Sequence, residues 1–252
     1  MGKEGEVKVK SLQKAMEVLE CFAQKQPLGV TEISEKLGLY KSNVHNILTT
    51  FTALGYLSQD AETGKFRLGV SIMSLSRAFR EGLDITRIAV PYMSEIANTA
   101  GELVYLTIPR EDSVVYLEGV SPDNQRMVSK SVAGEFCKMY CTSVGKAMLA
   151  NMPKEEVEKC ISGKLEAYTE NTITDKKSLL EEIEKTRIRG YGIDDMEIMF
   201  GIKCVGVALL NHDGKVEGGL SISAPSLRMS DEKIELYAKI LKEYAAKIQK
   251  ML

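Results

Sequence analysis

Apolar residues recur at helical spacing in two short segments near the start of the chain. In the first segment Val30, Ile33 and Leu37 fall on one face, which is typical of an amphipathic helix. The second segment, residues 40–54, carries its apolar residues on one face as well, namely Val44, Ile47, Leu48, Phe51 and Leu54. We therefore predict two consecutive helices that pack through these faces.

The residues around these segments predict where the helices begin and end. Thr31 is placed to cap the first helix with its hydroxyl, and Gly38 is placed to end it, because a left-handed position after a helix favours glycine. After the second helix, residues 56–60 and 65–69 alternate as two strands around a turn that contains Gly64. Helix, turn, helix and hairpin in this order predict a winged helix-turn-helix, whose second helix enters the major groove of DNA.

The polar face of the second helix favours nucleic-acid binding over simple solvation. Small amide and hydroxyl side chains approach base edges closely, and asparagine suits the N6/N7 edge of adenine. A merely solvated face more often carries Glu–Lys pairs, but residues 39–54 contain no acidic residue at all. A generic helical hairpin is the alternative. On the DNA interpretation, the predicted contacts are Thr31, Lys41, Ser42, Asn43, His45, Asn46, Thr49, Lys65 and Arg67.

The rest of the chain predicts a connector and a second domain. We assign residues 1–75 to the winged helix-turn-helix domain, 76–90 to a linker helix and 91–252 to a second domain, because Gly82 and Pro91 interrupt the helical pattern. Beyond residue 91, short Val- and Tyr-rich strands joined by turns alternate with helices, and one of these strands is predicted at 126–132. This pattern predicts an α+β class with an antiparallel sheet that is covered on at least one face.

Charge and composition limit the functional classes only in part. The formal net charge is −2, and residues 1–75 carry nine Lys/Arg against eight Asp/Glu, so DNA affinity would depend on local placement. This balance leaves open a ligand-binding protein whose N-terminal domain does not bind DNA. The polar N-terminus and the absence of a long apolar run predict no signal peptide and no membrane partner. Five cysteines without paired spacing are typical of reduced thiols, so we expect a cytoplasmic protein.

Candidate catalytic and metal-binding residues are sparse. The chain has two histidines, one on the predicted reading helix and one in a hairpin turn, and neither completes a triad. The run around Gly145 and Lys146 lacks the glycine and hydroxyl that a phosphate loop requires, and we expect no cofactor and no metal. The remaining enzyme hypothesis is a thiol nucleophile at Cys141 or Cys204, which would need a nearby base.

Binding residues are easier to find near the C-terminus. Asp194 lies on a predicted strand, and Ser221 and Ser223 share one face of another strand by their period of two. If that face is internal, the hydroxyls need a partner, whereas a solvent-facing strand would leave them hydrated. Together with the N-terminus of a helix that Thr142 caps, this set would suit a small carboxylate ligand.

These residues lie in segments that resemble a known family along nearly the whole chain. Residues 55–69, GYLSQDAETGKFRLG, are similar to the wing of IclR-type transcriptional regulators, and residues 141–153, CTSVGKAMLANMP, resemble a conserved segment of their second domain. Residues 188–225 resemble the family's signature region. The resemblance implies a winged helix-turn-helix joined by a linker helix to a GAF/PAS-like effector domain, in homodimers or homotetramers on double-stranded operator DNA.

The resemblance also implies an effector pocket and a regulatory function. It implies that Asp194, Cys204, Ser221 and Ser223 line the pocket, and that Gly134 and residues 142–145 close it. The predicted effector-binding set is therefore Gly134, Cys141, Thr142, Ser143, Gly145, Asp194, Cys204, Ser221 and Ser223. We expect a repressor whose operator binding is modulated by a small organic or aromatic acid.

Overall fold

The computed structural model describes residues 7–123 and 132–252, and the chain divides into two compact units. The first unit extends to Arg80, and the second begins at Glu81. Most of the strand predicted at 126–132 lies outside the described residues. Within the described ranges, no helix has the length and apolar character needed to cross a membrane.

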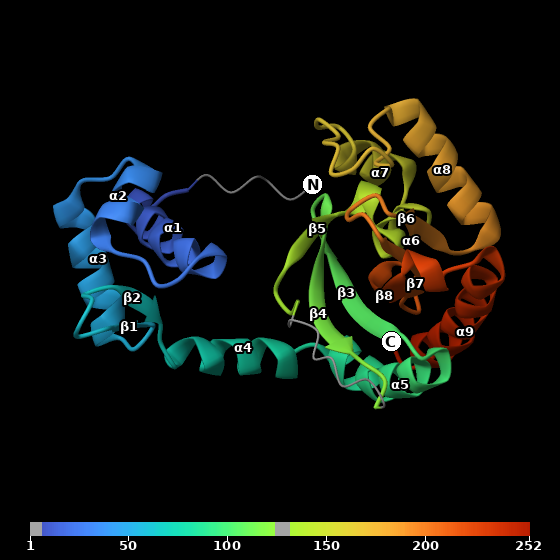
Figure 1. Cartoon of the computed structure of the whole chain (residues 1–252), viewed down its shortest axis with the longest axis horizontal. Helices are drawn as coiled ribbons and strands as arrows, with labels where there is room; N and C mark the ends of the chain where they lie inside the picture. Colours follow the sequence, from blue (N-terminus) through green and yellow to red (C-terminus); the bar gives the residue numbers. More distant parts are fainter. Residues whose placement is uncertain (1–6, 124–131) are drawn as a thin grey trace. The chain divides into compact units, whose positions relative to one another are not determined.

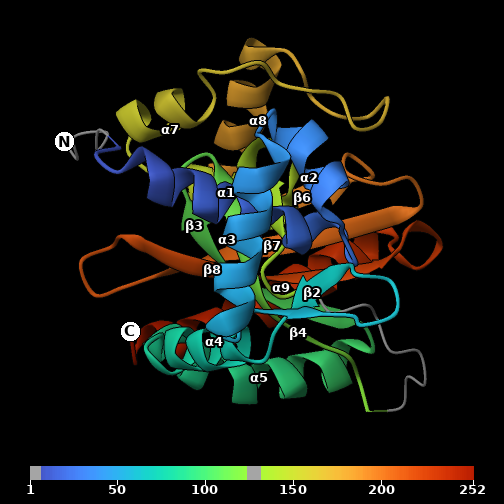
Figure 2. The ribbon, with the colours of Figure 1, turned by 90° about the vertical axis from the view of Figure 1, so that its left-hand side faces the viewer.

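The first unit begins with three helices and a hairpin (Figure 2). They are α1 (Lys10–Gln24), α2 (Val30–Leu37), α3 (Lys41–Ala53), β1 (Leu57–Gln59) and β2 (Phe66–Leu68), with β1 and β2 antiparallel. Their apolar faces meet in one core, in which Phe22, Ile33 and Leu48 are buried. The predicted helix–turn–helix–hairpin order is therefore confirmed, and only Leu54 of the predicted apolar face is exposed.

The start of α2 differs from the prediction. Gly29, not Thr31, is the N-cap residue, and its backbone amide donates a hydrogen bond to Glu32 Oε2 at 2.9 Å. Thr31 lies inside the helix with an exposed side chain, because the helix begins one residue before it. Gly38 ends α2 with a φ of 64°, as the sequence predicts.

Only Gly69 and Val70 lie between the hairpin and α4 (Ser71–Glu81). The Gly69 amide donates to the Tyr56 carbonyl at 2.7 Å, and the Ser71 amide donates to the Gly55 carbonyl at 3.2 Å. The Ser71 hydroxyl also donates to the Leu54 carbonyl at 3.2 Å. A Cβ at Gly69 would lie 2.2 Å from the Gly55 carbonyl oxygen, so this close contact requires glycine. The end of α3, the end of β2 and the start of α4 are thus joined by direct backbone contacts.

A six-stranded antiparallel sheet forms the centre of the second unit (Figure 1). The strand order is β5-β4-β3-β8-β7-β6, so hairpins that are distant in the sequence meet where β3 pairs with β8. The strands are β3 (Leu103–Arg110), β4 (Ser113–Val120), β5 (Phe136–Lys138), β6 (Gly192–Asp195), β7 (Ile202–Leu210) and β8 (Val216–Pro225). The α+β prediction is confirmed, although β5 was not predicted.

Two helices cover one face of this sheet, α5 (Asp84–Ala100) and α9 (Asp231–Gln249) (Figure 1). The prediction that Pro91 interrupts the helical pattern was wrong, because α5 begins at Asp84 and runs through the proline. A proline inside a helix removes one amide donor, and here Ile85, Ala89 and Met93 pack into the core on both sides of it. The helical pattern that was assigned to a linker therefore belongs in part to the core of the second unit.

Three further helices gather on the opposite face, α6 (Ser143–Leu149), α7 (Lys154–Cys160) and α8 (Lys176–Arg189) (Figure 1). Helix α6 lies directly on the sheet, because glycines at neighbouring positions leave room for its backbone. A Cβ at Gly206 would lie 2.5 Å from the Val144 nitrogen, and one at Gly192 would lie 2.0 Å from the Ser143 oxygen. Gly192 and Gly206 are register partners on β6 and β7, so the two glycines lie side by side beneath α6.

Candidate functional sites

The polar face of α3 is exposed along its whole length. The predicted contact residues of this helix all have exposed side chains, namely Lys41, Ser42, Asn43, His45, Asn46 and Thr49. Val44 and Leu48, on the opposite side of the helix, are buried in the core. Helix packing therefore turns the amide and hydroxyl side chains outward, as a groove-reading helix requires.

The two basic residues of the hairpin have different surroundings. Arg67 on β2 is exposed, whereas Lys65 is half-buried and its ammonium lies 3.1 Å from Glu32 Oε2. Lys25 approaches the other oxygen of Glu32 at 3.2 Å. The Gly29 amide and these two lysines lower the pKa of Glu32 to about 2, so this carboxylate stays charged. Lys65 thus already has a carboxylate partner, and Arg67 is the more exposed of the two basic residues.

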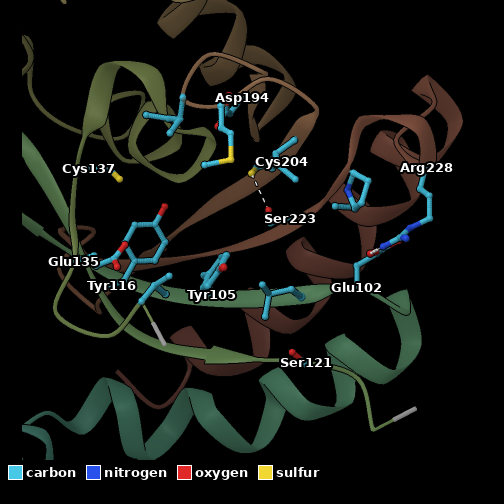
Figure 3. A pocket seen from close by; sticks show the side chains of 17 residues that line it. Glu102, Tyr105, Tyr116, Ser121, Glu135, Cys137, Asp194, Cys204, Ser223 and Arg228 are labelled. Atoms are coloured by element: carbon cyan, nitrogen blue, oxygen red, sulfur yellow. Dashed lines mark hydrogen bonds and ion pairs between the residues drawn. The ribbon is translucent and has the colours of Figure 1, made fainter. Parts of the chain in front are cut away.

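A cavity of about 650 Å³ opens in the second unit (Figure 3). It lies on the sheet face that carries α6, beside the part that α6 leaves uncovered. Cross-strand register places Leu103, Ser223, Cys204 and Asp194 in one row from β3 to β6, and all four line the cavity. The start of α6, at Ser143 and Val144, covers the next row of β6 and β7 on the same face, and the cavity lies beyond it. Its polar wall residues are Glu102, Tyr105, Tyr116, Ser121, Glu135, Cys137, Asp194, Cys204, Ser223 and Arg228.

The cavity wall includes Asp194, Cys204 and Ser223 of the predicted effector-binding set. Ser221 lies on the same sheet face but is buried opposite Gly206, one row from Ser223, and is not part of the wall. Gly134 is exposed between two wall residues. The remaining members are buried at the start of α6, away from the cavity wall, namely Cys141, Thr142, Ser143 and Gly145. Thr142 caps α6 as predicted, since its Oγ1 accepts a hydrogen bond from the Gly145 amide at 3.1 Å.

Asp194 is the most perturbed acid of the cavity wall. Its side chain is 5% exposed, and its Oδ1 accepts a hydrogen bond from the Glu197 amide at 2.7 Å. Burial is the main cause that raises the pKa of Asp194 to about 7, and the neighbouring charge of Glu197 adds to the shift. Near neutral pH this carboxyl therefore exchanges between a hydrogen-bond donor and an anion.

The Cys204 thiol in the cavity wall is not activated as a nucleophile. Cys204 Sγ donates to Ser223 Oγ at 3.3 Å, and burial, followed by the charge of Asp194, raises the pKa of Cys204. Burial also raises the pKa values of Cys137 and Cys141. A reactive thiol needs a lowered pKa, so these cysteines lack the activation that a nucleophile requires.

Two pairs in the wall were not foreseen from the sequence. The rings of Tyr105 and Tyr116 meet edge to face, with their centroids 5.1 Å apart. At the other end of the cavity, Arg228 donates two hydrogen bonds to Glu102, at 2.7 and 2.6 Å (Figure 3). Glu102 and Arg228 are far apart in the sequence, and only the pairing of β3 with β8 brings them together.

Comparison with known proteins decides the family. Residues 78–250 match the family described as the bacterial transcriptional regulator IclR C-terminal domain, and residues 11–61 match the IclR helix-turn-helix domain. The chain belongs to the IclR family. These matches and the described fold confirm the expected DNA-binding winged helix-turn-helix followed by an effector domain.

Individual IclR-family proteins resemble the chain over most of its length. The HTH-type transcriptional regulator KdgR of Escherichia coli is 34% identical over 242 residues, which cover 95% of this chain and 91% of KdgR. The transcriptional repressor IclR of Escherichia coli is 27% identical, covering 93% and 87% of the two chains. An IclR homologue of Microbacterium hydrocarbonoxydans, solved with 4-hydroxybenzoate, has a TM-score of 0.82 at 23% identity, covering 95% and 98%. The chain is therefore similar to transcriptional regulators throughout both units.

Proposed function

We propose that the chain is a repressor that α3 directs to operator DNA and that a small acid in the second unit regulates. The observation that carries the DNA interaction is the exposed α3 face, which presents amides, hydroxyls and one lysine without any acidic residue. Asn43 and Asn46 would contact base edges, while Lys41 and Arg67 would contact phosphates. The related transcriptional repressor IclR of Escherichia coli is named a repressor, which supports repression over activation.

The cavity supports a small organic or aromatic acid as the effector. Asp194, Cys204 and Ser223 supply hydrogen-bonding groups on one side, and Tyr105 and Tyr116 supply aromatic surface on the other. A protonated Asp194 would donate a hydrogen bond to a ligand carboxylate, which an ionised Asp194 would repel. The 4-hydroxybenzoate held by the Microbacterium homologue is a ligand of this chemical class.

Regulation would act on an assembly of several copies. We expect a cytoplasmic homodimer or homotetramer that binds a near-palindromic operator, because paired reading helices match two-fold related half-sites. The effector can change DNA affinity only by its preference for one arrangement over another, which is usually about 1–3 kcal/mol. On this proposal the chain is not an enzyme, and the raised thiol pKa values argue against the thiol-nucleophile alternative.

Substitutions on the reading helix should separate base contacts from phosphate contacts. We expect Asn43→Ala and Asn46→Ala each to weaken binding to the specific operator by about 1–3 kcal/mol and to leave non-specific binding unchanged. Arg67→Ala should weaken binding to all duplexes and lower the dependence of log K on log salt by about one. The measurement is fluorescence anisotropy on a duplex selected from a random-sequence pool, with a scrambled duplex as the control.

Two outcomes would contradict this docking. Operator affinity equal to that of the wild type in all three variants would remove α3 and the hairpin from the DNA interface. Binding that does not weaken with salt would instead favour a ligand-binding protein whose first unit does not contact DNA, because phosphate contacts make affinity fall steeply with salt.

The effector site is tested by ligand-dependent stability. We expect a small acid from a panel of 2-oxo acids and benzoates, 4-hydroxybenzoate included, to raise the thermal midpoint of the full chain. Saturation at 100 times the dissociation constant corresponds to about 2.7 kcal/mol. Ser223→Ala should reduce this shift because it removes a hydroxyl of the cavity wall, whereas Ser162→Ala, at an exposed hydroxyl near the end of α7, should not. Equal shifts in both variants would place the ligand elsewhere, and no shift across the panel would contradict an acid effector.

A further inference from the structure

A buried ion pair lies next to the cavity but does not line it. The ammonium of Lys146 on α6 contacts Glu197 Oε1, and the two side chains are 1% and 5% exposed. Glu197 Oε2 is also buried and has no hydrogen-bond partner. A buried ion pair usually contributes no more stability than apolar side chains of the same size, so stability alone does not account for this one.

The pair is joined to the cavity through one backbone group. The Glu197 amide donates to Asp194 Oδ1 at 2.7 Å, and the turn between the two residues contains Met196 with a φ of 60°. The hydroxyls of Thr169 and Thr172 donate to the carbonyls of Met196 and Glu197, at 2.7 and 2.6 Å. The backbone of Glu197 is therefore held by two threonines, and its side chain is held by α6.

We propose that Lys146 and Glu197 are positioning residues that hold the Asp194 carboxyl at the cavity and set whether it carries a proton when the effector binds. This assignment rests on the proposed function for its ligand, an acid whose carboxylate accepts a hydrogen bond from protonated Asp194. Neither residue contacts the ligand. They act through the Glu197 amide and through the two charges that they place beside Asp194.

The charges around Asp194 support this assignment. Burial is the largest cause that raises its pKa; the charge of Glu197 raises the pKa further, and that of Lys146 lowers it. Asp194 also interacts with four described groups on β4, β5, β7 and the turn before α6. All have raised pKa values and are neutral at pH 7, namely Tyr116, Cys137, Cys204 and Cys141. The ion pair is thus the main source of charge that adjusts Asp194.

The test is the titration of the Asp194 carboxyl, which needs no ligand. Carbon-13 NMR of the full chain with labelled aspartate side chains would follow it, and Asp194→Asn would assign the signal. We expect Glu197→Gln to lower the midpoint by about one pH unit or more, because Lys146 then has only Asp194 as a counter-charge. Lys146→Met should raise the midpoint, because the attractive charge is lost while the carboxyl of Glu197 remains.

A matched variant and a double variant complete the experiment. Lys203→Gln removes a lysine that lies 2.8 Å from Asp195, a pair closer to solvent, and should leave the Asp194 midpoint unchanged. If a single variant does not fold, Lys146→Met combined with Glu197→Gln leaves no unpaired buried charge and should fold. In that chain, loss of the side-chain anchor should speed hydrogen exchange of the amide at position 197 by about tenfold or more.

The outcomes separate this assignment from the proposed function. Midpoints within a few tenths of a unit of the wild type in both single variants would overturn it, and so would unchanged amide exchange in the double variant. If no acid of the panel binds, that result would contradict the proposed function, but it would not alter the titration result.

Discussion

Asp194→Asn is expected to gain stability relative to the wild-type chain as the pH rises from 5 to 8. The native pKa of Asp194 is raised to about 7, mainly by burial, and its ordinary value is 3.8. Between these values the native state holds a proton that the unfolded state has released, so wild-type stability from this group falls as the pH rises, and the full loss is present above pH 7. Asparagine carries no charge, and its side-chain oxygen can still accept the hydrogen bond from the Glu197 amide.

The expected size follows from the pH interval. Two pH units between pH 5 and the native pKa correspond to about 2–3 kcal/mol, because one unit is worth about 1.4 kcal/mol. For a unit of this size, that energy corresponds to a thermal-midpoint difference of roughly 5–10 °C. The midpoint of the second unit would be measured by calorimetry at pH 5, 6, 7 and 8.

Asp195→Asn is the matched control. Asp195 is the next residue on β6, but its carboxylate is half exposed and lies 2.8 Å from Lys203. We expect its substitution to change stability by less than about 0.5 kcal/mol at every pH, as is usual for an exposed pair. A stability difference between Asp194→Asn and the wild type that is the same at pH 5 and pH 8 would contradict a raised native pKa.

Gly206→Ala is expected to destabilise the second unit by about 1–3 kcal/mol or more. The new Cβ would lie 2.5 Å from the Val144 nitrogen and 2.7 Å from its Cα, and both are backbone atoms that cannot rotate away. Relief requires α6 to move off the sheet, which would also displace Lys146 and the start of the helix. Urea unfolding should show an earlier transition for the second unit and an unchanged one for the first.

Gly163→Ala provides the comparison for this variant. No heavy atom lies within 4 Å of the position that its Cβ would take, and its φ is not left-handed. Its stability should therefore equal or slightly exceed that of the wild type. Equal unfolding curves for the Gly206 and Gly163 variants would show that α6 adapts to the extra methyl group at little cost.

The two helices and the hairpin between residues 30 and 69 could be predicted from the sequence almost completely, because their signals are local. The period of Val44 and Leu48 fixed the buried side of α3, and the same period exposed Asn43 and Asn46. The cap of α2 was assigned to the wrong residue, since a glycine can serve as N-cap when a glutamate three residues later accepts its amide hydrogen bond. Pro91 was taken as a boundary because the sequence does not show how much packing holds a helix together around a proline.

The cavity could be predicted only where alternation along one strand was informative. The shared face of Ser221 and Ser223 was correct, but the strand pattern does not say which row α6 covers. That limit depends on the close contact at Gly192 and Gly206, a property of two strands and a helix together. The positions of Leu103 and Tyr105 opposite β8 depend on a pairing between distant segments, which the sequence does not show.

The close backbone contacts at Gly69 couple the orientation of α4 to that of α3. Since α4 is tied to the end of α3 through Gly55, Ser71 and Gly69, a rotation of α4 would carry the reading helix with it. The arm has 11 residues, and a helix rises about 1.5 Å per residue, so it is roughly 16 Å long. Only two residues separate it from α5. On the proposed function, an effector signal that reaches α4 would thus turn the reading helix and leave the fold of the first unit unchanged.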